Sequence, residues 1–176
     1  FKYIAEIIKK YEHKKRFIGG GEESYGYLVS DFVRDKDAVI SCCMIAEAAV
    51  FAKEQGLSLF DLLIGIYHEF GFYYESFLSV TKQGKSGSEE IKKMMEKFRN
   101  NPPKSINNSE VVMIKDYLLQ QQYGIAANEI IPIDLPKSDV LQFFTSDGSK
   151  ITVRPSGTEP KIKFYFGIIA ELPDGA

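Results

Sequence analysis

The hydrophobic pattern at the start of the chain has the period of a helix. Apolar residues recur every three or four positions, at Phe1, Ile4, Ile7, Ile8 and Tyr11. This spacing predicts that the chain opens on an amphipathic helix. The sequence RFIGG that follows predicts one short strand, which leads into a glycine-rich loop.

Two further helices are predicted before residue 72. The apolar stretch AVISCCMIAEAAVFAKEQ predicts a long helix from about Asp37 to Gly56. Ser58 predicts the start of the next helix, because Asp61 three residues later completes a capping box. Gly71 is a typical residue just beyond a helix end. Residues 1–71 are therefore predicted to be mostly helical, with one short strand.

From residue 72 onward the pattern changes to that of strands. The segments FYYESFLSVTKQG and EVVMIKDYL have strand composition, and Asp147-Gly148 lies between two apolar runs, as in a tight hairpin. The segment KIKFYFGII alternates, which predicts a strand with one buried face. Its apolar positions are Ile162, Phe164, Phe166 and Ile168.

One helix is predicted between these strands, and one stretch is predicted to be irregular. Ser88 is the expected helix cap, and Asn100 to Pro103 should end the helix. Its apolar stripe, Ile91, Met94, Met95 and Phe98, is typical of a core-facing side. The segment QQQYGIAANEIIPIDLP has no clear period. Residues 72–176 are therefore predicted to form an α+β unit with an antiparallel sheet.

Composition limits the possible functions. The chain has 176 residues, 44% of them hydrophobic, and a net charge of −2, so no basic field favours nucleic acid binding. No run of eighteen apolar residues predicts a membrane span. Cys42 and Cys43 are adjacent in a helical run, which favours two small core residues in a reducing cytoplasm over a disulfide. His13 and His68 have no metal-ligand spacing.

The start of the chain suggests a piece of a longer protein. The first residue is not Met, and it falls inside an amphipathic pattern. Three apolar helices with one short strand leave strand edges and apolar surface without a partner, so we expect residues 1–71 to expose an apolar patch or to have it covered by a neighbouring chain.

The turn TVRPSGTEPKIKFYF, from Thr152 to Phe166, has the chemistry of an anion site. Arg154 offers a planar fork of donors that fits a phosphate or a carboxylate, and Ser156 and Thr158 offer hydroxyls. Gly157 allows unusual torsions and a close approach of the backbone to a ligand. No nucleophile stands beside a base here. The alternative is an ordinary hairpin turn with a surface arginine.

A second loop, GGGEESYG, places Glu22 and Ser24 on a glycine-rich turn after a strand. Carboxylates and hydroxyls can hydrogen-bond to the vicinal hydroxyls of a sugar. A solvated surface turn is the alternative, and by itself the loop favours that alternative.

Three stretches, FKYIAEII, GGGEESYG and VRPSGTEPKIKFY, occur in an order that resembles the α-D-phosphohexomutase family of phosphoglucomutases and phosphomannomutases. The resemblance covers essentially the whole chain. It implies the end of an α/β domain three over residues 1–71 and an antiparallel α+β domain four over residues 72–176. Such enzymes carry a phosphoserine in domain one and Mg²⁺ in domain two. This chain contains neither a TASHNP-like nor a DGDxDR stretch.

The resemblance implies roles for individual residues, none of them catalytic or metal-binding. The substrate phosphate would be bound by Arg154, Ser156, Gly157 and Thr158, and the sugar hydroxyls by Glu22 and Ser24. Lys2 resembles a lysine that faces the substrate cleft. The form GEESYG is closer to the GEESFG of phosphoglucomutases than to the GEMSGH of dual-specificity members, which favours glucose over mannose.

The implied function is that of the C-terminal part of a cytoplasmic phosphoglucomutase. The full-length enzyme would use Mg²⁺, glucose 1,6-bisphosphate as activator and intermediate, and its own domains one and two as partners. It would not bind nucleic acid or membranes. The fragment alone should be inactive. Phosphomannomutase, phosphopentomutase and other phosphohexomutases remain alternatives, as do a non-catalytic phosphosugar-binding module and a structural interaction domain.

Overall fold

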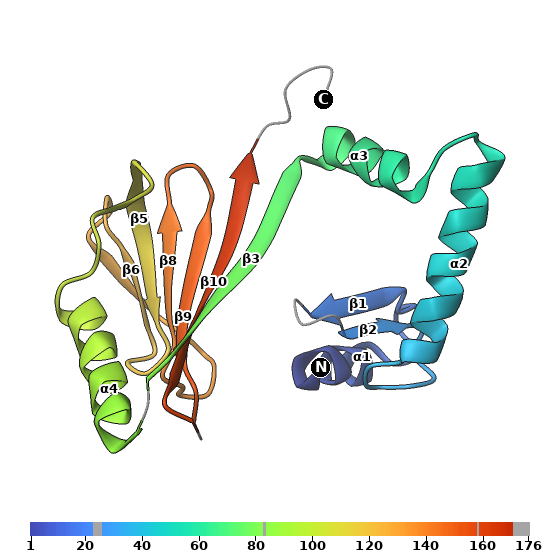
Figure 1. Ribbon diagram of the computed structural model, residues 1–176. Coiled ribbons are helices and arrows are strands. Elements are labelled where there is room, and N and C mark those ends of the chain that lie inside the picture. Colours follow the sequence, from blue (N-terminus) through green and yellow to red (C-terminus); the bar gives the residue numbers. More distant parts are fainter. Residues whose placement is uncertain (23–25, 83, 158, 171–176) are drawn as a thin grey trace. The chain divides into compact units, whose positions relative to one another are not determined.

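The computed structural model describes residues 1–22, 26–82, 84–157 and 159–170. The chain separates into two units, Phe1–Glu69 and Phe70–Ala176 (Figure 1). The first unit is mainly helical, and the second contains an antiparallel sheet with a helix against it. Among the described residues, no helix is long and apolar enough to cross a membrane.

The first unit contains the three predicted helices and a two-stranded hairpin. The prediction of one short strand was incomplete, because GYLV forms a second strand that pairs antiparallel with the first. The second strand has only four residues and begins with a glycine of the glycine-rich loop, so its apolar run was too short to predict a strand. The elements are α1 (Lys2–Tyr11), β1 (Gly19–Glu22), β2 (Gly26–Val29), α2 (Ala38–Glu54) and α3 (Leu59–Phe70).

Local side chains fix the starts of α2 and α3. The Asp37 carboxylate accepts the backbone amides of Val39 at 3.0 Å and Ile40 at 3.1 Å, so it caps two donors that the helix leaves unpaired. Ser58 and Asp61 form the predicted capping box: the Ser58 amide donates to the Asp61 carboxylate at 2.8 Å, and the Asp61 amide donates to the Ser58 hydroxyl at 3.2 Å.

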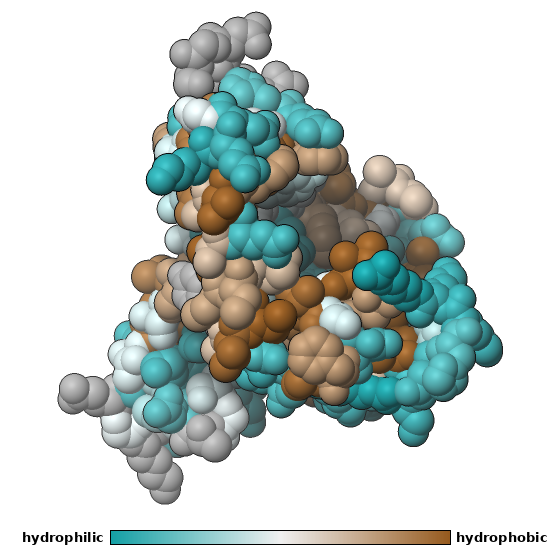
Figure 2. Space-filling view, turned by 90° about the vertical axis from the view of Figure 1, so that its right-hand side faces the viewer, coloured by the Kyte–Doolittle hydropathy of each residue, from teal (hydrophilic) through white to brown (hydrophobic). Residues whose placement is uncertain are grey.

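The first unit exposes a large apolar surface, as predicted. Val39 on α2 is 77% exposed, and Phe60 on α3 is 68% exposed. Hydrophobic surface of this kind is coloured brown in Figure 2. Cys42 and Cys43 are also exposed, so the prediction of two core residues was wrong. The reason is that α2 is rich in apolar residues on all sides, while Ala52 is the one residue of this helix that is buried.

The second unit is built around a sheet of eight antiparallel strands within the described residues. Strands β3, β10, β9, β8, β5, β6 and β7 lie side by side in that order, and β4 pairs with β5. The strands are β3 (Phe72–Thr81), β4 (Ser105–Ile106), β5 (Ser109–Asp116), β6 (Gln121–Gly124), β7 (Glu129–Pro132), β8 (Leu141–Thr145), β9 (Lys150–Pro155) and β10 (Lys161–Ala170).

Two local predictions for this unit were wrong. The segment predicted to be irregular forms β6 and β7, which pair antiparallel with each other. Their glutamines and proline hid the strand pattern. Helix α4 spans Gly84–Asn100, so it begins four residues before the predicted cap Ser88. Its predicted end at Asn100 is confirmed, because two prolines follow at 102 and 103.

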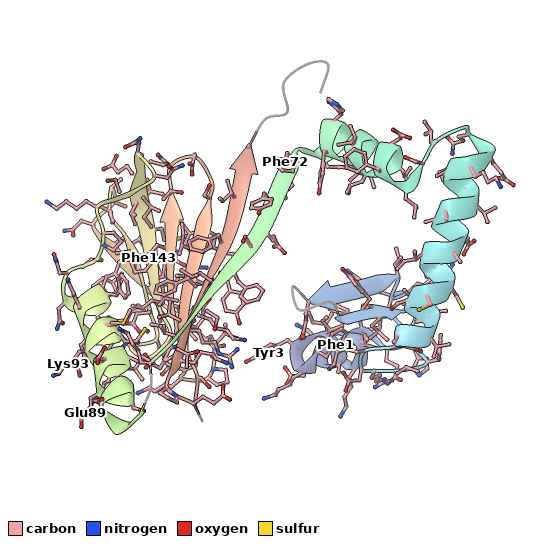
Figure 3. The ribbon with its side chains drawn as sticks, viewed as in Figure 1. Phe1, Tyr3, Phe72, Glu89, Lys93 and Phe143 are labelled. Carbon is pink, nitrogen blue, oxygen red and sulfur yellow. The ribbon has the colours of Figure 1, made fainter. Side chains whose placement is uncertain are left out.

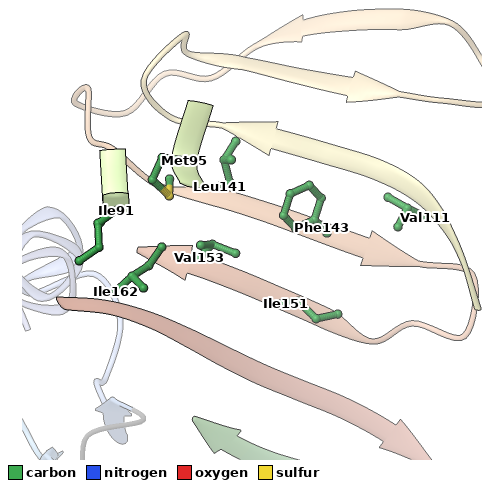
Figure 4. Close-up of a cluster of buried hydrophobic side chains, with 8 residues drawn as sticks. All are labelled: Ile91, Met95, Val111, Leu141, Phe143, Ile151, Val153 and Ile162. Atoms are coloured by element: carbon green, nitrogen blue, oxygen red, sulfur yellow. The ribbon is translucent and has the colours of Figure 1, made fainter. Parts of the chain in front are cut away.

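A hydrophobic core lies between α4 and one face of this sheet (Figure 4). Phe143 on β8 is 1% exposed, and its ring centroid lies 6.2 Å from that of Phe98 on α4. The predicted alternation of β10 is confirmed for Ile162, Phe164 and Phe166, while Ile168 stays 39% exposed. The fully buried side chains of the core include Met95, Val111, Leu141, Phe143, Val153 and Ile162.

The predicted hairpin at Asp147-Gly148 joins β8 to β9. Gly148 has a φ of +83°, a torsion that other residues rarely adopt. The Asp147 carboxylate accepts the Thr145 hydroxyl at 2.6 Å and the Ser149 amide at 3.0 Å. These hydrogen bonds, that of Thr145 first, lower the pKa of Asp147 below its usual value. The hairpin fixes the register of β9, whose far end carries the candidate site.

Candidate functional site

The loop between β9 and β10 is closed by its own hydrogen bonds. The Ser156 amide donates to the Lys161 carbonyl at 2.7 Å, and the Lys161 amide donates to the Glu159 carbonyl at 2.7 Å. The Glu159 amide donates to the Ser156 hydroxyl at 3.3 Å. These bonds tie Ser156 and Glu159 to each other and to Lys161, the first residue of β10. Thr158, the fourth predicted phosphate contact, lies outside the described residues.

Arg154 stands directly opposite a second cation. In the antiparallel register of β9 and β10, Arg154 pairs with Lys163. Their neighbours Val153 and Ile162 are buried in the core, so Arg154 and Lys163 project from the face of the sheet that lies away from α4. Among the described residues, neither cation makes an ion pair. Like charges placed opposite each other on a sheet repel, and a bound anion would relieve this repulsion.

Polar side chains hold β9 beside this pair. The Tyr117 hydroxyl donates to the Gln142 amide oxygen at 2.9 Å, and the Gln142 amide nitrogen donates to the Thr152 hydroxyl at 3.1 Å. Burial raises the pKa of Tyr117 above its usual value, so Tyr117 remains a neutral donor. Thr152 is two residues before Arg154 and shares its face of the sheet. The hydrogen bonds from Tyr117 to Gln142 and from Gln142 to Thr152 therefore hold β9, the strand that carries Arg154, in place.

A hollow of about 280 Å³ lies on the α4 side of the same loop. Ser156 and Gly157 form its wall on the loop side, and Ile91 and Met95 of α4 form its apolar floor. The remaining lining residues are Ser88, Lys92, Asp139, Pro155, Glu159 and Pro160. The loop is thus accessible from both sides.

Gly157 differs in one respect from its sequence prediction. Its φ is not in the left-handed region, and a Cβ built on it would meet no atom within 4 Å. The fold therefore does not require glycine here for an unusual torsion. The open space beside Gly157 is consistent with the other part of the prediction, a close approach of the backbone to a ligand.

Gly157→Val should impair ligand binding and leave folding intact. A side chain at position 157 would meet no other atom of the protein, so valine should not disturb the fold. The valine would, however, project into the space that a bound phosphoryl group needs. We expect the Michaelis constant for the phosphosugar to rise by more than it does when the Ser156 hydroxyl alone is removed. Steady-state kinetics together with the melting temperature measure this. An unchanged Michaelis constant would contradict it.

Of the other predicted site residues, the structure describes Glu22 and Lys2, both in the first unit. Glu22 ends β1, and its carboxylate lies beside Phe1. A Cβ on Gly26 would lie 2.7 Å from both the Phe1 ring and the Lys36 side chain, so glycine is needed there for close packing. The Lys36 ammonium lies 4.7 Å from the centre of the Phe1 ring.

Two further predicted residues have different outcomes. Lys2, on the first turn of α1, is exposed, and its ammonium lies 5.7 Å from the centre of the Tyr3 ring. It is adjacent in sequence to Phe1, which lies beside Glu22. Ser24 lies outside the described residues. Labels in Figure 3 mark Phe1 and Tyr3 at this end of the chain.

The described residues contain no group of three or more His, Cys, Asp and Glu side chains that could hold a metal ion. The second unit offers a loop with two cations that make no ion pair with a described residue, and a nearby hollow. This combination suits an anion that is bound and positioned by hydrogen bonds and charge.

Comparisons with known proteins agree with this fold and order of elements. The family model for the phosphoglucomutase/phosphomannomutase alpha/beta/alpha domain III matches residues 1–70, and the one for the C-terminal domain matches residues 85–167. A phosphoglucomutase of Staphylococcus aureus strain MRSA252 is 40% identical over 174 residues, which are 99% of this chain and 31% of that protein. One from Staphylococcus haemolyticus is 37% identical over 96% of this chain and 30% of its own length.

Among solved structures, the open form of pp63/parafusin from Paramecium, an exocytosis-sensitive phosphoprotein and phosphoglucomutase, matches 90% of this chain and 27% of its own chain. The TM-score is 0.57 at 19% identity, so this likeness supports the fold alone. The chain spans about 30% of the length of the curated relatives it matches. Its two matched regions and its 40% identity to phosphoglucomutases show that the chain belongs to the phosphoglucomutase/phosphomannomutase family, of which it carries domain III and C-terminal domain sequence.

Proposed function

We propose that this chain is the C-terminal part of a phosphoglucomutase that interconverts glucose 1-phosphate and glucose 6-phosphate. Residues 1–71 would belong to the sugar-binding domain three and residues 72–176 to the phosphate-binding domain four. The observation that carries the proposal is that two facing cations, Arg154 and Lys163, make no ion pair with a described residue and lie beside a loop that offers Ser156 and Gly157. Support from the comparisons is the 40% identity to phosphoglucomutases over nearly the whole chain.

In this proposal the second unit binds the phosphoryl group that is not reacting. Arg154 and Lys163 supply charge, while Ser156, Gly157 and Thr158 supply hydroxyl and backbone donors. A site of this kind breaks no bond, and its contribution is to position the other end of the sugar for phosphoryl transfer. Because the site recognises a phosphoryl group, it can hold either end of a bisphosphorylated sugar such as glucose 1,6-bisphosphate.

The first unit would recognise the sugar. Glu22 and Ser24 would bind vicinal hydroxyls, and Lys2 would face the substrate. The reacting phosphoserine and Mg²⁺ are assigned to domains one and two of the full-length protein, where the metal would stabilise charge on the transferred group. The enzyme would work in the cytoplasm on a phosphorylated hexose, without nucleic acid or membrane partners.

An assay of the full-length protein tests the proposal. We expect turnover of glucose 1-phosphate to exceed that of mannose 1-phosphate and ribose 1-phosphate, and to require Mg²⁺. The 176-residue chain alone should show no turnover. Faster turnover of mannose or ribose phosphate would instead assign a phosphomannomutase or a phosphopentomutase. Binding of phosphosugar with no turnover by the full-length protein would assign a non-catalytic binding module.

A further inference from the structure

The hollow beside the loop brings one residue of α4 to the candidate phosphate site. Its lining includes Ser156 and Gly157 from the loop and Lys92 from α4. Lys92 is exposed and lies one residue after the buried Ile91, at the edge of the helix face that packs on the sheet. The helix is anchored by that face, so Lys92 extends from a fixed backbone.

The charges around the hollow leave a positive charge without a partner. Of the carboxylates that line it, Asp139 contacts Arg99, and Glu159 accepts the Lys161 ammonium at 3.1 Å. Lys92 makes no ion pair or hydrogen bond among the described residues. Glu159 is paired with Lys161, while Asp139 shares Arg99 with Asp116, so the charges around the hollow nearly balance. Among the described lining residues, Lys92 is the one cation, and it is therefore the side chain through which the hollow can contact an anion.

We propose that Lys92 contacts the bound phosphoryl group of the substrate from the α4 side of the loop. Arg154 and Lys163 project from the opposite face of the sheet, but the loop continues beyond the ends of both strands. Side chains from the two faces can therefore meet a ligand at the loop. This inference rests on the proposed phosphate site and adds a residue to it. It makes Lys92 a substrate-positioning residue with no part in bond breaking.

Charge-neutral and charge-conserving variants of the full-length enzyme test this role. Lys92→Gln should raise the Michaelis constant for glucose 1-phosphate, and the inhibition constant of inorganic phosphate, by about tenfold, which is the lower range for a hydrogen bond to a charged group. Lys92→Arg should restore both constants to within about threefold, because it keeps the charge. The melting temperature of both variants should equal that of the unchanged protein, since Lys92 is exposed.

Lys93 provides the matched control. It is the next residue along α4 (Figure 3). It is also exposed and is not among the residues that line the hollow. Lys93→Gln removes the same charge from the same helix and should leave both constants unchanged. If Lys92→Gln behaves like Lys93→Gln while Arg154→Ala weakens binding, the role of Lys92 is wrong and the phosphate site stands. If Arg154→Ala also binds normally, the proposed phosphate site itself is wrong. A loss of melting temperature in Lys92→Gln with unchanged constants would assign Lys92 a structural role and overturn the inference.

Discussion

Arg154→Ala in the full-length enzyme should lower kcat/KM for glucose 1-phosphate by roughly 100-fold. Hydrogen bonds to charged groups contribute about 1.5–3 kcal/mol, and a two-pronged arginine contact lies at the upper end of this range. Both KM and kcat should change, because a phosphoryl group that is loosely held also misplaces the reacting end of the sugar. Steady-state kinetics with glucose 1-phosphate measure the effect.

Lys150→Ala is the control for this experiment. Lys150 is exposed, lies on β9 and shares a sheet face with Arg154, but it stands at the opposite end of the strand, beside the Asp147 hairpin. It removes one positive charge from the same strand without touching the loop, so we expect kcat/KM to stay within about twofold. The melting temperature of Arg154→Ala should also stay unchanged, since Arg154 is exposed and makes no ion pair with a described residue. Wild-type kinetics in Arg154→Ala would mean that this loop is an ordinary hairpin turn.

Arg99→Met should lower the free energy of unfolding by about 3 kcal/mol, the lower range for removing one partner of a buried ion pair. Arg99 near the end of α4 donates to the Asp116 carboxylate at 2.9 Å and also contacts Asp139. The Asp116 side chain is only 4% exposed. Burial acts to lower the pKa of Arg99, but the hydrogen bonds and charges of Asp139 and Asp116 outweigh it, so the net pKa is raised and Arg99 stays charged. Its removal leaves the Asp116 charge buried without a cation.

Two further variants identify the cause of this loss. Lys97→Met removes an exposed cation from the same last turn of α4, and therefore the same favourable interaction with the helix dipole, so it should cost well under 1 kcal/mol. Asp116→Asn in the Arg99→Met background should recover part of the loss, because it removes the buried charge and keeps an acceptor for the amides of Leu118 and Leu119. Denaturant unfolding gives all three values. Equal losses for Arg99→Met and Lys97→Met would show that the buried pair contributes nothing specific.

The parts of the fold that the sequence predicted are those set by neighbouring residues. The capping box of Ser58 and Asp61, the hairpin at Asp147-Gly148 and the alternation of Ile162 and Phe164 each depend on residues within a few positions of one another. In β6 and β7 the strand state comes from pairing with neighbours in the sheet, since the local composition does not favour it. Single-sequence patterns contain no such pairing information.

The same distinction applies to the site. Arg154 and Gly157 are in one short motif, so the sequence alone singles them out. Lys163 and Lys92 join them only through the pairing of β9 with β10 and the packing of α4 on the sheet. A signal for Lys163 was present, because the alternation of KIKFYF places it on the face opposite Ile162 and next to a tight turn. For Lys92 the apolar stripe of α4 gave no such signal.

The pairing of β3 with β10 has a consequence for how this part of the chain is made. Residues in β3 pair with residues 80 to 98 positions later, and β10 is the element that places β3 in the sheet. While the ribosome is still synthesising β4 to β9, β3 has no partner strand, and its backbone N–H and C=O groups can pair with other nascent chains. Its exposed apolar side chains, Tyr73, Tyr74, Phe77 and Leu78, favour such association. Such distant pairing slows folding. Chaperones that bind aromatic segments during translation should therefore raise the yield of the folded unit. A chain truncated before β10 should aggregate or be degraded by proteases.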